Sequence, residues 1–336
     1  MRLMLSAGIA AAYLLALTGI SPAIAEPVTP PAAPTAHNNE PVFNSITTAL
    51  AWTVLHPDAI PAGANQWDCV PSPAHPNPVV LLHGTWANAF NNWSLVSATL
   101  KNKGYCVFAP NYGLDRNSVL GMLPWARATG EPTDSAKQVA AFVDQVLTRT
   151  GAPQVDLVGH SQGVAIGRQY MRFEGGTDPA DPTRNKVAKL ISIAGPNAGT
   201  TLHGVENFNR TLDSMGIPPT DLYGLIFGRS ILGFGAHASF IANLNANGQT
   251  DPGVAYTTIT TRYDELLTPI ETTFLTAGPD ATVNRVILQD GCELDYVEHA
   301  NMTYDPRVIH FIAQALDPTT DIGPAPCEFV PPVILK

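Results

Sequence analysis

A glycine-flanked serine directly after a short apolar run constrains the fold of this chain more than any other feature. Residues 155–158 have the composition of a buried β-strand, residues 159–163 read Gly-His-Ser-Gln-Gly, and residues 164–173 carry a helical pattern. A chain of this length contains a Gly-x-Ser-x-Gly match by chance in roughly 10% of cases. The flanking strand and helix make this match specific, because together they predict a sharp strand-to-helix turn that exposes the Ser161 hydroxyl at the edge of a sheet.

Short apolar runs alternate with helical patterns along most of the chain. Apolar runs predict further strands at residues 78–82, 105–109, 187–193, 256–260 and 283–288. Helical spacing of apolar residues predicts helices at residues 93–103, 135–150, 164–173 and 306–316. The second helix is expected to have Asp134 or Ser135 as its N-cap, and the last is expected to have Asp305 as its N-cap. This alternation predicts an α/β fold with a mostly parallel sheet flanked by helices.

The charge balance excludes one class of partner. The 336 residues include 18 Lys and Arg against 28 Asp and Glu, a formal net charge of −10. A polyanion such as DNA or RNA would be repelled, and no basic stripe offsets that repulsion. We therefore expect no nucleic-acid partner.

The first 25 residues are typical of a secretory signal peptide. Arg2 provides a positive start, residues 3–20 are apolar, and Ala23-Ile24-Ala25 is a small-x-small cleavage pattern. We expect cleavage after Ala25, export from the cell and no stable membrane span in the cleaved form. A membrane anchor is the alternative, because the apolar run approaches spanning length.

The cysteine count suggests disulfides. Four cysteines lie beyond the predicted signal peptide, and an even number in an exported chain favours two bridges. Three pairings are possible. Nearest-neighbour pairing is favoured here, because each pair then brackets one contiguous segment: Cys69 with Cys106, and Cys292 with Cys327. No Cys-x-x-Cys or histidine-rich spacing supports a metal site.

A nucleophilic serine requires a base and an orienting acid, which follow it in the order Ser, Asp or Glu, His in folds of this type. Asp264 lies where the chain leaves the predicted strand 256–260, and we expect it to be the acid, with Glu265 as the alternative. His299 precedes the last helix and is the expected base. His310 competes with it, but His310 lies inside that helix and is expected to pack or face solvent.

An oxyanion hole requires two preorganised backbone N–H groups. The first is expected from Gln162, the residue after the nucleophile. The second is expected from Thr85, because His83 and Gly84 turn the chain tightly after the predicted strand 78–82. His160 is expected to border the pocket.

These motifs resemble those of the secreted bacterial lipases of the α/β-hydrolase superfamily, in particular the class-2-type lipases of actinobacteria and the small Bacillus-type lipases. The resemblance is carried by residues 80–85, 158–163, 256–264 and 299–302. It implies Ser161 as nucleophile, His299 as base, Asp264 as acid, and Thr85 with Gln162 as oxyanion donors. The chain is much longer than the smallest Bacillus-type lipases, so the shape of the pocket is not implied.

The resemblance and the motifs together predict a serine hydrolase that cleaves acylglycerol esters through an acyl-enzyme, at an oil–water interface and without a cofactor. The alternatives are a broad carboxylesterase or polyester hydrolase, an acyltransferase with the same triad, and a non-catalytic surface-binding protein. We expect a proline-rich tether at residues 26–45 and a catalytic domain at residues 46–336. Its apolar, glycine-interrupted segment at residues 197–247 is expected to form a groove or flap over the site, or helices packed on the core.

Overall fold

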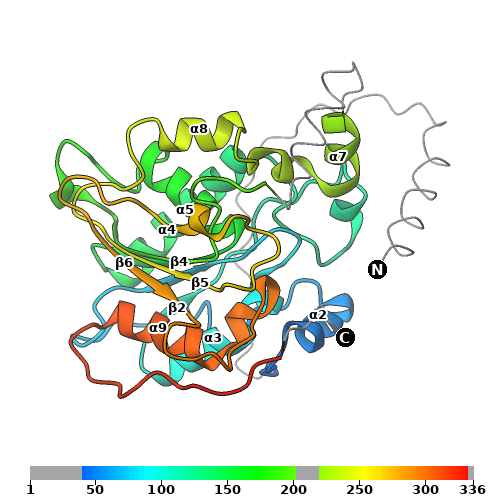
Figure 1. Ribbon diagram of the computed structural model, residues 1–336. Coiled ribbons are helices and arrows are strands. Elements are labelled where there is room, and N and C mark those ends of the chain that lie inside the picture. Colours follow the sequence, from blue (N-terminus) through cyan, green and yellow to red (C-terminus); the bar gives the residue numbers. More distant parts are fainter. Residues whose placement is uncertain (1–39, 202–218, 332–336) are drawn as a thin grey trace. The chain divides into compact units, whose positions relative to one another are not determined.

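The computed structural model of the chain describes residues 40–201 and 219–331 (Figure 1). The predicted signal peptide, most of the predicted tether and residues 202–218 of the apolar segment at residues 197–247 lie outside these ranges. In the part that is described, no helix has both the length and the apolar character needed to cross a membrane.

Six parallel strands form one sheet, in the order β2-β1-β3-β4-β5-β6. Their bounds are β1 Val79–Leu82, β2 Val107–Phe108, β3 Val155–His160, β4 Val187–Ile193, β5 Ala255–Thr260 and β6 Thr282–Ile287. Parallel strands need crossover connections, and helices supply most of these. The prediction of a mostly parallel sheet flanked by helices is confirmed.

Helices cover both faces of the sheet (Figure 1). Helices α4 (Pro132–Thr150), α5 (Gln162–Phe173) and α8 (Ser239–Asn245) pack on one face, and α3 (Ala89–Asn102) and α9 (Pro306–Leu316) pack on the other. Strand side chains alternate between these two cores: Val80 and Leu82 of β1 join the first, whereas Val79 and Leu81 join the second. All four are fully buried, which explains why β1 is a continuous apolar run.

Further described elements are two helices, α2 (Ile46–Leu55) and α7 (Pro219–Phe227), and several 3₁₀ turns: η1 (Leu120–Met122), η2 (Pro182–Arg184), η4 (Arg229–Gly233), η5 (Ile270–Thr273) and η6 (His299–Tyr304). Helix α2 is not expected from the sequence. Its ten residues are mostly apolar without a polar face, and it borders the site described below.

Two observed helix starts differ from the predicted ones, and the residues at each start explain why. Helix α3 begins at Ala89, four residues before the predicted start, because Asn88 and Asn91 form a reciprocal capping box. Helix α4 begins at Pro132, so the predicted N-cap at Asp134 or Ser135 is wrong; proline suits a first helical turn, where its missing N–H is not needed.

The predicted cap of α9 is confirmed, since the Asp305 side chain accepts hydrogen bonds from the N–H groups of Arg307 and Val308. All six predicted strands are present, although β2 contains two residues where five were expected.

Two disulfides link segments that are distant in the sequence. Cys69 is bonded to Cys106, immediately before β2, and Cys292, after β6, is bonded to Cys327 near the end of the described chain. The second bridge therefore closes a loop that contains η6 and α9.

The described part of the apolar segment at residues 197–247 has two environments. Ile241 and Leu244 of α8 are buried in the core with Phe234, as the packed-helix alternative expects. Leu225 of α7 is 57% exposed, so this helix does not join the core in the same way.

Candidate active site

Ser161 lies in the tight turn between β3 and α5. Its backbone has φ 55° and ψ −127°, a strained conformation for a residue with a side chain. The flanking glycines are required by close approach: a β-carbon at residue 159 would lie 2.8 Å from the Val164 nitrogen, and one at residue 163 would lie 2.1 Å from the Leu82 oxygen. The turn therefore holds the hydroxyl at the carboxyl edge of the sheet, as the Gly-x-Ser-x-Gly pattern predicts.

A continuous hydrogen-bonded chain joins Ser161, His299 and Asp264. The His299 Nε2 atom is 2.9 Å from Ser161 Oγ, and its Nδ1 atom is 2.8 Å from Asp264 Oδ2. The three residues come from the ends of different strands: β3 leads to the serine, β5 to the aspartate, and the loop after β6 to the histidine at the start of η6. The distances suit proton transfer from the hydroxyl to the ring.

The Asp264 carboxylate is held in its ionised form. Its Oδ1 atom accepts hydrogen bonds from the N–H groups of Leu266 at 3.0 Å and Leu267 at 2.7 Å. Burial alone would raise the pKa of this carboxyl. The charge attraction and hydrogen bond of His299, with the two backbone donors, outweigh burial and lower its pKa below the ordinary value.

The same pairing acts on the histidine. Burial opposes the imidazolium form of His299, but the attraction and hydrogen bond of Asp264 raise its pKa above the ordinary value of 6.5. Glu265 and Glu298 add smaller contributions in the same direction. The environment is therefore arranged to stabilise a proton on this ring.

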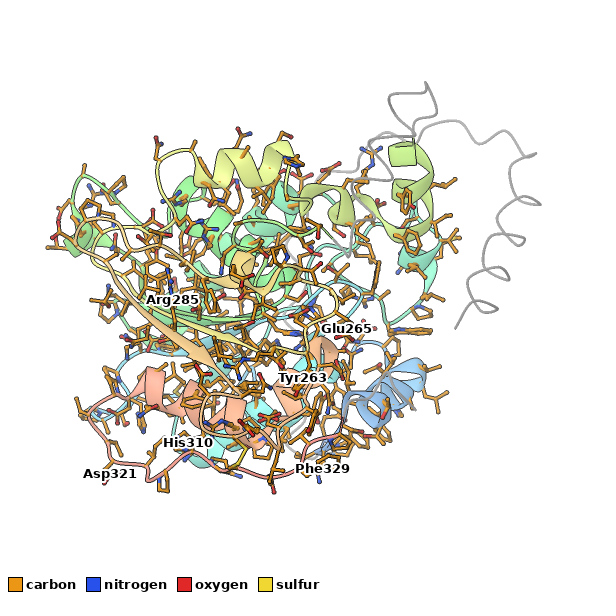
Figure 2. The ribbon with its side chains drawn as sticks, viewed as in Figure 1. Tyr263, Glu265, Arg285, His310, Asp321 and Phe329 are labelled. Atoms are coloured by element: carbon orange, nitrogen blue, oxygen red, sulfur yellow. A yellow bond between two sulfur atoms is a disulfide. The ribbon has the colours of Figure 1, made fainter. Side chains whose placement is uncertain are left out.

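The other candidates for the acid and the base lie outside the hydrogen-bonded chain. Glu265, which Figure 2 labels, follows Asp264 in the loop after β5, yet both of its carboxylate oxygens are buried without a hydrogen-bond partner among the described residues. His310 lies on α9 and contacts Phe311 edge-on, outside the hydrogen-bonded chain. His83 is fully buried, with its Nδ1 atom 3.0 Å from the carbonyl oxygen of Gly84. The structure thus brings together Ser161, Asp264 and His299.

Two backbone N–H groups near the serine are available to a ligand. Within residues 40–201 and 219–331, neither the Thr85 N–H nor the Gln162 N–H makes a hydrogen bond to protein. The Thr85 hydroxyl donates to Gln162 Oε1 at 2.5 Å, which ties the loop after β1 to the first turn of α5. Both residues line the cavity next to Ser161, as an oxyanion hole requires.

The cavity at the serine has a volume of about 240 Å³ and mostly apolar walls. The loop after β1, the segment after α7 and the loop after β5 contribute Trp86, Ile231, Phe234, Leu266 and Leu267, and α2 contributes Ile46. Sequence reasoning missed Ile46, Leu266 and Leu267, because apolar residues in loops and in a helix without a polar face give no periodic signal. An apolar wall beside a polar reaction centre suits a substrate with an apolar arm.

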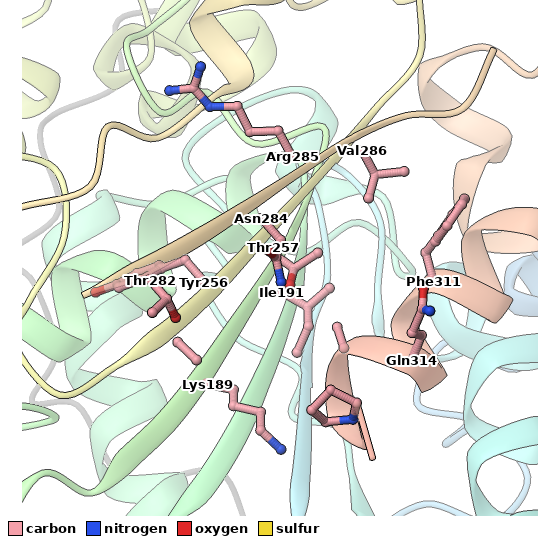
Figure 3. A pocket seen from close by; sticks show the side chains of 13 residues that line it. Lys189, Ile191, Tyr256, Thr257, Thr282, Asn284, Arg285, Val286, Phe311 and Gln314 are labelled. Carbon is pink, nitrogen blue, oxygen red and sulfur yellow. The ribbon is translucent and has the colours of Figure 1, made fainter. Parts of the chain in front are cut away.

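A larger cavity of about 500 Å³ lies elsewhere, between the β4–β6 part of the sheet and α9 (Figure 3). Lys189, Arg285 and Phe311 are among its lining residues, and it contains none of the three hydrogen-bonded site residues. Ser161 and His299 line the smaller of these two cavities.

The described residues include no group of three or more His, Cys, Asp or Glu side chains placed to hold a metal ion.

Comparisons with known proteins identify relatives of this chain. Residues 76–311 match the family described as Lipase (class 2). A triacylglycerol lipase of Pseudarthrobacter phenanthrenivorans is 26% identical over 189 residues, which is 55% of this chain and 50% of that protein. A triacylglycerol lipase of Burkholderia plantarii is also 26% identical over 189 residues, 55% of this chain and 45% of that protein. The match therefore spans about half the length of these relatives.

A solved structure shares the fold. Lipase B of Aspergillus fumigatus superposes with a TM-score of 0.55 at 18% sequence identity, covering 80% of this chain and 56% of that one. The family match covers both the strand-to-serine turn and His299, and it extends over most of the chain. The chain belongs to the class 2 lipase family.

Proposed function

We propose that this protein hydrolyses carboxylic esters, with water-insoluble acylglycerols as its substrates. The observation that carries the proposal is the continuous hydrogen-bonded chain from Ser161 through His299 to Asp264 beside an apolar cavity. Membership of the class 2 lipase family supports the same activity, as do the triacylglycerol lipases among its relatives.

In the proposed mechanism, Ser161 Oγ attacks the ester carbonyl while its proton moves to Nε2 of His299. Asp264 holds the ring and stabilises the imidazolium. The N–H groups of Thr85 and Gln162 bind the oxygen that becomes negatively charged. The imidazolium then protonates the leaving alcohol, and the acyl group remains on the serine.

The second half of the cycle repeats these roles with water. His299 takes a proton from a water molecule, whose oxygen attacks the acyl-enzyme carbonyl. The same two N–H groups bind the second oxyanion. Collapse of that intermediate releases the fatty acid and returns the proton to Ser161 Oγ, so no cofactor enters the cycle.

The substrate class follows from the cavity walls. Leu266 and Leu267 line the cavity together with side chains from the segment after α7, including Ile231. An acyl chain placed there would leave water, and each buried methylene contributes about 0.8 kcal/mol. Esters with an acyl arm are therefore favoured over acetate esters, although the same triad would hydrolyse both.

We also propose that the protein is exported, with cleavage after Ala25, a tether at residues 26–45 and a catalytic domain at residues 46–336. The apolar leader and the small-x-small pattern of Ala23 and Ala25 support export. The two disulfides support it too, because such bonds persist in oxidising compartments.

The test is a series of glycerides and p-nitrophenyl esters of increasing acyl length, assayed with the parent protein and with Ser161→Ala. We expect hydrolysis of emulsified triacylglycerols by the parent and a loss of roughly 10⁶ in kcat in the variant. Turnover of soluble short esters without any action on emulsions would place the protein among the esterases instead. Equal activity of parent and variant would reject the mechanism.

A further inference from the structure

A buried histidine that the proposed mechanism does not use contacts the backbone of His299. His160 is the last residue of β3, immediately before Ser161, and is 4% exposed. Its Nε2 atom is 3.0 Å from the carbonyl oxygen of His299. Its ring also lies next to the His299 ring, with 5.1 Å between the centroids, and edge-on to buried Trp93.

The other ring nitrogen of His160 faces an oxygen atom. Nδ1 is 3.2 Å from Oδ1 of Asn92, a side chain of α3 that is 1% exposed. The orientation of the Asn92 amide is fixed, because the same oxygen accepts the N–H of Gly84 at 2.8 Å, and a backbone N–H can only donate. Both nitrogens of His160 therefore face acceptors.

A neutral imidazole has one N–H to offer to these two acceptors. Burial, together with the neighbouring His299, lowers the pKa of His160 to about 3, so the ring is neutral at the pH where a lipase works. The carbonyl of His299 is nearer than the Asn92 oxygen, and the latter already receives the Gly84 N–H. The single proton consequently belongs on Nε2, pointing at His299.

We infer that His160 is a positioning residue that fixes the catalytic histidine to the nucleophile turn through an Nε2–H hydrogen bond to the His299 carbonyl. This inference rests on the proposed function of Ser161 and His299. The two chain segments are then joined at two points: the Ser161–His299 side-chain bond and the His160–His299 backbone bond.

The two links differ in what happens to them during turnover. The bond between Ser161 and His299 is broken whenever the serine carries an acyl group. The bond from His160 involves no reacting atom and persists through the cycle. It therefore keeps the ring of His299 within reach of the leaving group and of the attacking water, at a stage where a displacement of about 1 Å costs about 100-fold in rate.

Two amide substitutions test which of the two ring nitrogens of His160 is required. In His160→Gln the amide nitrogen can reach the position of Nε2 and still donate to the His299 carbonyl. In His160→Asn the amide is one methylene shorter and reaches the position of Nδ1 instead. The two variants are matched in chemistry, and His160→Phe removes both contacts while it retains a ring.

We expect His160→Gln to keep kcat within about threefold of the parent. His160→Asn and His160→Phe should lower kcat by about 10-fold to 100-fold at nearly unchanged KM, with rates expressed per serine titrated by a fluorophosphonate. A variant that merely folds less well would lower the titrated fraction and leave kcat per titrated site unchanged. Parent-like kcat in His160→Phe, or better rescue by Asn than by Gln, would overturn the inference.

A measurement on the parent protein keeps the inference testable if a variant fails to fold. Nitrogen-15 NMR of histidine-labelled protein, with His160 assigned from the signals lost in His160→Gln or from their coupling to neighbouring protons, reports which nitrogen carries the proton. We expect Nε2–H and no titration between about pH 5 and about pH 8. A proton on Nδ1 would overturn the inference.

The Ser161 and His160 variants distinguish a failure of the proposed function from a failure of the inference about His160. If Ser161→Ala keeps the activity of the parent, the proposed function is wrong and His160 positions no catalytic base. If Ser161→Ala is inactive while all His160 variants match the parent per titrated serine, the proposed function stands and the inference alone is wrong.

Discussion

At the scale of single residues, two neighbouring carboxylates have different surroundings. Asp264 accepts hydrogen bonds from His299 and from two backbone N–H groups, whereas the oxygens of Glu265 have no partner in the described part of the chain. The sequence places both in the same loop and cannot separate them, because the choice depends on which side chain the turn directs toward the histidine. In the structure, the turn directs Asp264 toward His299.

Asp264→Asn should therefore lower kcat by about 10⁴, since the amide favours the wrong imidazole tautomer and no longer stabilises the imidazolium. Glu265→Gln is the matched control and should cost far less. In the parent, the base must be neutral, so kcat/KM should rise with pH through a pKa above 6.5, the ordinary histidine value. The remaining activity of Asp264→Asn should have this acid limb at lower pH, because the attraction that raises the pKa is removed. A larger loss in Glu265→Gln would identify Glu265 as the acid.

At the scale of secondary structure elements, the sequence predicts what depends on neighbouring residues and misses what depends on tertiary contacts. Short runs rich in apolar and β-branched residues locate all six strands, and Asp305 followed by proline locates the start of α9. Helix α2 is missed, since its residues show no polar face and its buried side contacts Phe90 and Tyr304, which are distant in the chain. Ser161, Asp264 and His299 could be proposed because the order of motifs along the chain carries that information, whereas the contacts of His160 could not.

The cap of α9 also predicts how stability depends on pH. Burial, and the nearby carboxylate of Asp295, raise the pKa of Asp305 from 3.8 to about 7. A group whose pKa is raised on folding contributes stability that is fully present below its unfolded value and is lost as the pH rises through its folded value. The parent should thus lose melting temperature between pH 3.8 and about 7 from this source.

Asp305→Asn keeps an acceptor for the N–H groups of Arg307 and Val308 but cannot ionise. Its melting temperature, relative to the parent, should improve steadily as the pH rises across that window. Asp317→Asn, at the other end of α9, is the control: hydrogen bonds from Thr320 and Thr319 lower the pKa of Asp317 to about 2, so this variant should show no such trend. A constant difference between Asp305→Asn and the parent at every pH would refute the assignment.

At the scale of the whole molecule, the two disulfides close loops of nearly equal length that contain different parts of the candidate site. Their sequence separations are 37 residues for Cys69–Cys106 and 35 for Cys292–Cys327. Chain entropy predicts a similar loss of about 4 kcal/mol in stability when either is removed. Only the second loop contains His299, and its ends lie on either side of η6 and α9.

Replacing each cysteine pair with serine therefore distinguishes the effect of a bridge on stability from its effect on catalysis. Removal of Cys292–Cys327 should lower kcat at temperatures where the protein is still folded, because the segment that carries the base is less constrained. Removal of Cys69–Cys106 should lower the melting temperature by a comparable amount and lower kcat per titrated serine much less. Thr85 also lies in that loop, but it follows shortly after β1, which β2 and β3 hold on both sides. Parallel losses of kcat in both variants would show that the second bridge has no special relation to the base.

The apolar cavity predicts selectivity for acyl length. Ile231 lines the cavity at the serine, whereas its neighbour Leu232 in η4 lines a different cavity and is 38% exposed. Ile231→Ser should reduce kcat/KM for long-chain esters much more than for p-nitrophenyl acetate, since each methylene that leaves water contributes about fourfold in rate. Leu232→Ser should leave the ratio of the two substrates unchanged. Equal losses on both substrates in Ile231→Ser would mean that acyl chains do not reach this wall.

The central claim is that Ser161 is an activated nucleophile, and covalent labelling tests it most directly. The parent protein is incubated with a fluorophosphonate, digested, and mapped by mass spectrometry, with Asp264→Asn treated in parallel. We predict one adduct per chain, on Ser161, loss of ester hydrolysis in proportion to labelling, and much slower labelling of the variant. An unlabelled Ser161 in a protein that hydrolyses esters, or full inhibition with the adduct on another residue, would contradict it.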